Sequence, residues 1–233
     1  MRRLVRVFWG PRPEPVEAVA ARWRATLGGF DALLDAPGPG RERSWQQIRP
    51  SGPPTDLTGD RDSLRGVLVA ARADADWSDV IGDALRVAAT GAPGWDVEIS
   101  GLAGGAPEYL LQSLVATIAA PDDAAVPEAE LLAMLVRVWE PDFGDVTDDD
   151  ILDALEDDAD LAVGDPCIGR HAYLSPGRAG RLPEDLGATV RRFGGGALVA
   201  VEGDVDEVVR VYRRIREAGA LEPLPRPMDR ATL

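Results

Sequence analysis

The chain has little of several residue types, and each shortage excludes a class of protein. Cys167 is the only cysteine among 233 residues, so the chain has no second thiol for an internal disulfide or a cysteine metal site. Lysine is absent, and all 25 basic residues are arginine. No apolar run approaches the ~20 residues of a membrane-spanning helix, and the run Leu4–Trp9 is too short for a secretory signal. We therefore expect a cytoplasmic protein.

Residues that carry chemistry are also scarce. His171 is the only histidine and no GxSxG-type motif accompanies it, so we expect a packed or surface histidine. The glycine-rich segments 101–105 and 194–196 lack the spacing of phosphate-binding loops and are more typical of turns. One cysteine and one histidine do not form a zinc site. The sequence thus predicts no catalytic residue, no metal and no cofactor, and so no enzyme.

Acidic residues are abundant. The chain has 40 acidic and 25 basic residues, which gives a formal net charge of −15. Such a charge repels DNA, RNA and anionic membranes at long range, so we expect none of them as a partner. It permits a basic protein partner, although solubility alone would also explain it.

Hydrophobic periodicity gives the expected elements. Trp95, Val97 and Ile99 alternate with polar residues, which predicts a half-buried strand that could pair with a strand at 110–118. Residues 36–60 are expected to form a long loop with Trp45 as an anchor. Helical spacing predicts helices near residues 16–30, 64–71, 80–89, 127–139 and 205–215, and a further helix that starts at Thr147. Further β-prone runs predict strands near residues 4–8, 168–174, 189–193 and 197–201.

These elements predict an α+β fold. Helices and strands are mixed without regular alternation, and the tight turn at 194–196 requires antiparallel pairing. We expect a mixed or antiparallel sheet, or sheets, with helices packed on one face, and the pattern leaves open two similar halves. Residues 1–222 are expected to form a single domain, followed by a flexible C-terminal tail at 223–233.

The acidic segment, Glu140–Asp160, is the strongest local feature. No basic residue occurs between Arg137 and Arg170. Carboxylates on a helix and its flanking loops can imitate the phosphates that a nuclease groove holds, and an aromatic residue can anchor the contact. For Trp139, core packing is the favoured interpretation. The candidate partner-binding residues are Glu140, Asp142, Phe143, Asp145, Asp148, Asp149, Asp150, Asp153, Glu156, Asp157 and Asp158.

Calcium is the alternative ligand for this segment. Asp145, Thr147, Asp149, Asp153 and Glu156 fall at positions one, three, five, nine and twelve of an EF-hand-like loop. Position six, where the sharp turn requires glycine, is an aspartate, and the leucine spacing suits a helix better. We therefore favour a basic protein over a calcium ion.

The N-terminal motif Phe8-Trp9-Gly10-Pro11-Arg12-Pro13-Glu14, with the Ala- and Arg-bearing helix after it, resembles the opening of the immunity protein 52 family. Later landmarks occur in the order of that family. They are Trp45, the Trp95 strand, the segment 138–142, Tyr173-Leu174-Ser175 and the turn at 195–198. The similarity extends over residues 4–221. The chain departs from the family pattern at Asp96-Val97 and at Arg170, which leaves the toxin subtype open.

The resemblance implies an immunity protein encoded beside a polymorphic toxin, often a nuclease delivered by type VI or related secretion. We expect it to bind its cognate toxin domain in the cytoplasm and to inhibit it stoichiometrically by covering or distorting the active site. Trp9, Gly10, Pro11, Arg12 and Glu14 are expected to be structural. An enzyme or small-ligand protein would instead show carboxylates converging on a pocket. A scaffold would show a self-complementary apolar patch.

Overall fold

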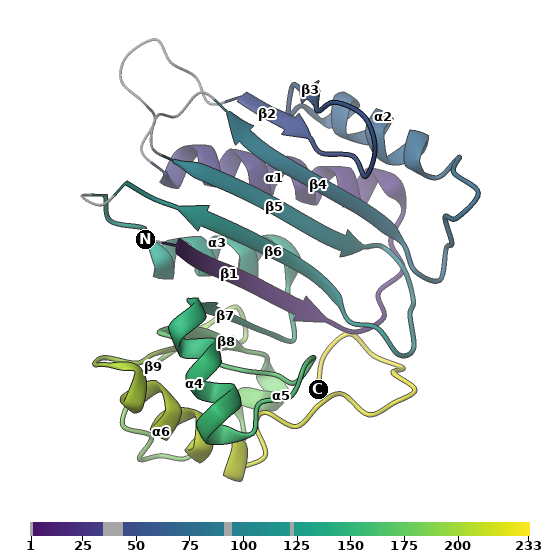
Figure 1. The fold of residues 1–233 in the computed structure, drawn as a ribbon. Helices are drawn as coiled ribbons and strands as arrows, with labels where there is room; N and C mark the ends of the chain where they lie inside the picture. The colour runs from purple at the N-terminus through teal and green to yellow at the C-terminus, as the bar shows by residue number, and fades with distance from the viewer. Residues whose placement is uncertain (1, 35–43, 91–94, 122–123) are drawn as a thin grey trace.

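The computed structural model describes residues 2–34, 44–90, 95–121 and 124–233. Within these residues six helices accompany one ten-stranded sheet (Figure 1). The helices are α1 (Val16–Leu33), α2 (Arg61–Ala71), α3 (Glu128–Trp139), α4 (Asp149–Ala159), α5 (Pro176–Ala179) and α6 (Val205–Glu217). The strands are β1 (Arg2–Trp9), β2 (Ser44–Gln47), β3 (Thr55–Leu57), β4 (Asp83–Thr90), β5 (Asp96–Ala103), β6 (Gln112–Ala119), β7 (Phe143–Thr147), β8 (His171–Leu174), β9 (Thr189–Phe193) and β10 (Gly196–Ala200).

The sheet is continuous and antiparallel. Its strand order is β3-β2-β4-β5-β6-β1-β7-β8-β10-β9, and every neighbouring pair is antiparallel. The expected α+β class is therefore confirmed. The predicted pairings of β5 with β6 and of β9 with β10 are also present. Strand β1 lies between five strands on one side (β3, β2, β4, β5 and β6) and four on the other (β7, β8, β10 and β9), so the two parts of the sheet differ in size.

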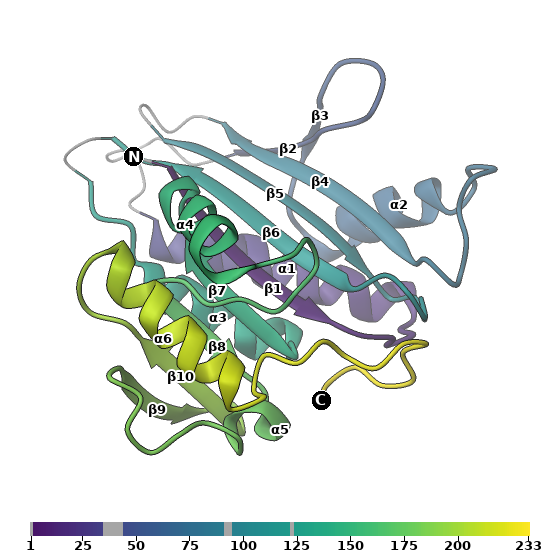
Figure 2. The same cartoon turned by 60° about the horizontal axis from the view of Figure 1, so that its bottom comes forward.

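Helices cover different faces of the two parts. α1, α2 and α3 lie on one face, and α4 and α6 lie on the opposite face over β7, β8 and β10 (Figures 1 and 2). The alternation of side chains in β1 explains how one strand serves both layers. Val5, Val7 and Trp9 enter the core under α1 and α3, whereas Phe8 packs against the core under α4 and α6.

The helices form where the sequence predicts an apolar stripe. In α1 the side chains of Val19, Trp23, Leu27 and Phe30 recur every three or four residues and are fully or almost fully buried. Aspartates begin three of the other helices, because a carboxylate satisfies free backbone N–H groups there. Asp60, Asp148 and Asp204 accept such bonds at the starts of α2, α4 and α6.

Two predictions of local structure were wrong. Residues 80–89 do not form a helix, because Leu85 and Val87 alternate with exposed Arg86 and build strand β4. Part of the expected loop 36–60 forms the strands β2 and β3, of which β3 is an edge strand of the sheet. Residues 35–43 lie outside the described residues. Trp45 is the anchor that we expected. It is 3% exposed and meets the Phe30 ring edge-on, with 6.4 Å between ring centroids.

The tail 223–233, which we expected to be flexible, makes contacts with the body of the protein. The Gly10 N–H donates to Ala231 O at 2.8 Å, and the Met228 N–H donates to Glu108 O at 2.8 Å. The side chains of Leu224 and Met228 are buried. Its position at the end of the chain suggested a loose tail. Two buried apolar side chains and these backbone bonds connect it to the rest of the structure.

None of the helices in the described parts of the chain is long and apolar enough to cross a membrane.

Candidate functional site

The fold divides the acidic segment into an internal part and an external part. Residues 142–148 are all buried, on β7 and at its two ends. Asp142, Phe143 and Asp145, which we expected at the partner surface, are therefore inside the protein. Phe143 is 2% exposed and stacks on Phe8 with 5.0 Å between ring centroids. β7 lies between β1 and β8 and is covered on both faces, which the local sequence did not indicate.

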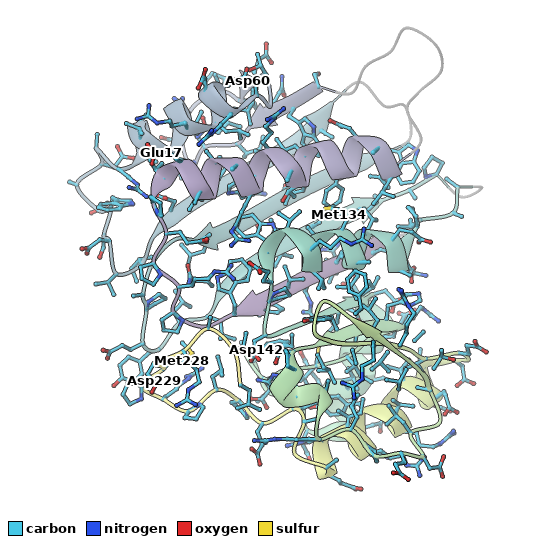
Figure 3. The ribbon with its side chains drawn as sticks, turned by 180° about the vertical axis from the view of Figure 1, so that it is seen from behind. Glu17, Asp60, Met134, Asp142, Met228 and Asp229 are labelled. Atoms are coloured by element: carbon cyan, nitrogen blue, oxygen red, sulfur yellow. The ribbon has the colours of Figure 1, made fainter. Side chains whose placement is uncertain are left out.

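Asp142 is the centre of a buried ion pair. Its Oδ2 accepts from Arg178 Nε at 2.9 Å and from Nη2 at 2.7 Å, and both side chains are fully buried. Its Oδ1 accepts from Ser175 Oγ and from the Leu233 N–H, each at 2.8 Å. Figure 3 shows Asp142 next to the C-terminal tail. The pair therefore ties β7 to α5 and to the end of the chain.

The guanidinium of Arg178 also bonds the segment that follows α6. Its Nη1 donates to Ala220 O at 2.8 Å and to Glu222 O at 2.9 Å. These bonds offset the cost of burying the charge, because each donor of a buried guanidinium requires an acceptor. Sequence reasoning did not single out Arg178. A lone arginine after a strand carries no local sign of burial.

Asp145 forms a second internal cluster. It pairs with Arg6 at 2.9 Å, and Arg6 Nη2 lies 2.9 Å from Cys167 Sγ. Burial raises the pKa of the Asp145 carboxyl, and the positive charge of Arg6 opposes that effect. Burial and the nearby Asp145 carboxylate also raise the pKa of the Cys167 thiol. The thiol therefore remains protonated and is not a reactive nucleophile.

The external part of the acidic segment is helix α4. Ile151, Leu155 and Ala159 point into the core under α4 and α6. The other faces are exposed and carry carboxylates at helical spacings of three, four and seven residues. The residues on this acidic face of α4 are Asp149, Asp150, Asp153, Glu156, Asp157 and Asp158.

The charges on this face are largely uncompensated. Asp149 is bonded by Arg2 at 2.8 Å, in a pair that is more than half exposed on both sides. The other five carboxylates of the face have no ion pair with any residue that the structure describes. Asp148, by contrast, caps the helix and pairs with Arg3 at 2.7 Å, so its charge is neutralised. The predicted partner surface thus contracts to residues 149–158 of α4.

Glu140 lies elsewhere, at the end of α3, and belongs to the cluster built by the N-terminal motif. Its carboxylate accepts from Arg22 at 3.1 Å, and Arg22 also bonds Glu14 and the Val138 carbonyl. The guanidinium of Arg12 lies 5.0 Å from the centroid of the Trp9 ring. Glu140 therefore links α3 to α1 rather than extending the acidic face.

The remaining motif residues have structural surroundings. Trp9 is fully buried and stacks on Trp139 with 5.2 Å between ring centroids. Gly10 is packed against the tail, and a Cβ there would lie 2.1 Å from Arg230 O. Its carbonyl accepts from the buried Gln112 amide at 2.9 Å. Pro11 follows at the turn from β1 toward α1 and is partly buried.

A calcium loop is not compatible with this geometry. Asp145 and Thr147 lie on β7, whereas Asp149, Asp153 and Glu156 lie along α4. Within the described ranges no group of three or more histidine, cysteine or acidic side chains is arranged to hold a metal ion. His171 is partly exposed on β8, and its Nε2 is 3.9 Å from Glu128 Oε2. Burial lowers the pKa of His171, and the Glu128 charge opposes that effect.

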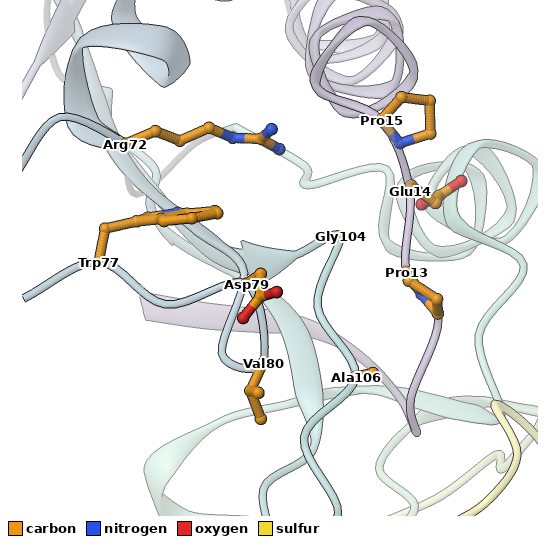
Figure 4. A pocket seen from close by; sticks show the side chains of 9 residues that line it. All are labelled: Pro13, Glu14, Pro15, Arg72, Trp77, Asp79, Val80, Gly104 and Ala106. Carbon is orange, nitrogen blue, oxygen red and sulfur yellow. The ribbon is translucent and has the colours of Figure 1, made fainter.

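One open pocket of about 430 Å³ lies at the end of the sheet where β5 ends and α1 begins (Figure 4). It contains two carboxylates, Glu14 and Asp79, of which Glu14 is bonded by Arg22 at 3.0 Å. The rest of the lining is Pro13, Pro15, Arg72, Trp77, Val80, Gly104 and Ala106. The sequence suggested only a polar stretch and a turn here, because the three segments that line the pocket, 13–15, 72–80 and 104–106, are far apart in the chain.

Comparisons with models of protein families and with curated proteins gave no match to this chain.

Proposed function

We propose that this protein binds a basic protein and inhibits it. In this proposal the partner is the toxin domain of a polymorphic-toxin system, and we favour a nuclease. The observation that supports this function is the acidic face of α4. Five carboxylates on one ordered helix lack a counter-charge in the described structure, so a basic surface would gain by covering them. The nature of the partner rests on the resemblance of the motif 8–14.

The arrangement of α4 suits such a contact. Its apolar stripe is anchored in the core, and its end is tied to α6, because Arg216 donates to the Ala159 carbonyl at 2.5 Å. A helix held in this way presents charge without an ordering cost on binding. Residues 150 and 157 are about 10 Å apart along the helix axis, given a rise of 1.5 Å per residue. This row of carboxylates is long enough to lie along a groove that holds a phosphate backbone.

Inhibition would result from occupation of the active site of the toxin by this protein, without any reaction catalysed by it. Carboxylates in the nuclease groove exclude the nucleic acid by occupying the basic side chains that bind it. The field of a chain with net charge −15 also accelerates the encounter with a basic partner. We propose that the protein acts in the cytoplasm, as a stoichiometric inhibitor and not as an enzyme.

The first test is co-expression with the C-terminal domain encoded by the adjacent upstream gene. Rescue of growth and co-purification of a complex are the expected results. Toxicity without rescue or binding would contradict the proposal.

The role of α4 requires a charge-matched control. The triple variant Asp150→Asn/Asp153→Asn/Asp157→Asn removes three exposed charges from α4. The control Asp56→Asn/Asp62→Asn/Asp96→Asn removes three exposed charges from other surfaces. We expect the α4 variant to slow association by about tenfold at low salt and the control by much less. Equal effects would show that only net charge matters.

A further inference from the structure

Two loops at one end of the sheet form a second surface, which we call the loop surface. One loop, residues 72–82, leads from α2 to β4, and the other, 104–111, leads from β5 to β6. The Ala106 N–H donates to Val80 O at 2.9 Å and joins them. A Cβ at Gly105 would lie 2.5 Å from the carbonyl oxygen of Ile81, so only glycine permits this approach. The two loops therefore form one fixed structure.

The loop surface exposes large apolar side chains. Val80 is 51% exposed, Ile81 41%, Tyr109 64% and Leu110 49%. They are four of the seven large hydrophobic residues that are exposed in the described structure, and all four lie on these two loops. Single exposed apolar residues are ordinary, but a group on adjacent loops is typical of a protein-binding surface.

Apart from Arg72 at the start of the first loop, the same loops carry only acidic charge. Asp74, Asp76, Asp79 and Glu108 are exposed, and segments 73–82 and 104–111 contain no basic residue. None of the four carboxylates forms an ion pair with another described residue. Arg72 at the edge is neutralised, because it makes two bonds to the buried Asp83 carboxylate, at 2.8 and 2.6 Å.

The pocket lies between this surface and residues 13–15, and it suits a cationic side chain with an apolar stem. In Figure 4 the carboxylate of Asp79 and the flat ring of Trp77 lie on one side of the pocket, and Pro13 and Pro15 lie opposite. The guanidinium of Arg72 already lies over the Trp77 ring, 5.2 Å from its centroid. The rings of Pro13 and Pro15 therefore provide the apolar surface that can contact the methylene groups of an arginine or lysine. The unpaired Asp79 carboxylate can accept from its charged end.

We propose that the loop surface is a second part of the partner interface, where a basic segment of the partner inserts an arginine or lysine side chain into the pocket. This inference rests on the proposed function, because it identifies a contact of that same partner. Charge decides the occupant. A second copy of this chain would bring four more carboxylates, and an anionic membrane would be repelled. Apolar residues beside the basic one would cover Tyr109 and Leu110.

The experiment measures the affinity of variants for the toxin domain that wild type binds. We expect Tyr109→Ser/Leu110→Ser to weaken binding by at least about tenfold, and Asp79→Asn by at least about fivefold. Val190→Ser removes an apolar side chain that is 45% exposed on β9, and it should bind like wild type. If the loop variants bind like wild type while the α4 triple variant does not, this inference fails and the proposed function stands.

A separate measurement applies if wild type binds no such domain, which would contradict the proposed function. The chain is then titrated with N-acetyl-arginine amide, with N-acetyl-norleucine amide as the neutral control. Saturable NMR shifts of the Trp77 indole and the Asp79 amide, lost in Asp79→Asn, would support a pocket for basic side chains. No saturable shift, or an equal shift along α4, would overturn it.

Discussion

The carboxylates on and next to β7 are close in sequence to those of α4, but the first are buried and the second are exposed. Asp142 and Asp145 are fully buried, and each is paired with an arginine from another part of the chain. Asp150, Asp153 and Asp157 are exposed and have no counter-charge among the described residues. A run of acidic residues in the sequence therefore does not form one surface. Because β7 is a central strand of the sheet, the carboxylates on and next to it form internal ion pairs.

The comparison also separates stability from binding. The internal carboxylates connect β7 with β1, α5 and the tail. Loss of Asp142, the fully paired one, should therefore destabilise the protein. The exposed carboxylates repel one another, so their loss should cost little stability and reduce binding. Four predictions test this contrast, from the largest expected effect to the smallest.

The largest effect is expected for Asp142→Asn, which leaves the buried Arg178 guanidinium without its carboxylate. Breaking a buried ion pair costs about 3–5 kcal/mol of unfolding free energy. Asp150→Asn, the same chemical change on α4, should alter stability by no more than about 0.5 kcal/mol. Urea unfolding followed by tryptophan fluorescence measures both. Similar losses in the two variants would remove the distinction between the internal and external carboxylates.

The second prediction concerns the tail that reaches Asp142. Gly10→Ala places a Cβ 2.1 Å from Arg230 O and 2.9 Å from Leu224 Cδ1. We expect a loss of about 1–3 kcal/mol and faster hydrogen exchange at the Met228 and Leu233 amides. Gly28→Ala is the control, because its Cβ meets no atom within 4 Å inside α1. It should stabilise the helix by about 0.5–1 kcal/mol. Unchanged exchange in the tail of Gly10→Ala would contradict the packing described.

The third prediction compares the pH dependence of an internal and an external aspartate. Burial raises the pKa of Asp145 above its ordinary value of 3.8, so the folded state holds the proton more tightly than the unfolded state does. The contribution of Asp145 to stability is then present below about pH 4 and is lost as pH rises through the folded pKa. The stability of wild type relative to Asp145→Asn should therefore fall with rising pH.

Asp60 should give the opposite slope. Hydrogen bonds from Thr58 and from the Ser63 and Asp62 amides lower its pKa, so its contribution is present above about pH 4 and is lost on acidification through the folded pKa. Unfolding free energies of wild type, Asp145→Asn and Asp60→Asn across that range measure both slopes. The same sign for the two aspartates would show that Arg6 outweighs burial at Asp145.

Sequence reasoning found what local pattern determines. The helical stripe of α1 and the alternation of Trp95, Val97 and Ile99 each depend on neighbouring residues, and the structure confirms both elements. The exposed carboxylates of α4 were found in the same way. Asp142 was misplaced because its partner, Arg178, is 36 positions away, and burial of a charge depends on that partner. The loop surface was missed because two distant turns form it only after β4 and β5 pair.

The smallest effect is expected at His171, which is the only histidine and therefore titrates alone near neutral pH among the side chains of ordinary pKa. Burial lowers its pKa below 6.5, so the unfolded state binds the proton more tightly than the folded state. Stability should rise with pH through 6.5 and fall below it, by less than about 1 kcal/mol between about pH 7.5 and about pH 5.5. His171→Gln should remove this slope and leave the Asp145 slope intact. A wild-type slope of opposite sign would mean that the Glu128 carboxylate, 3.9 Å away, outweighs the burial of the ring.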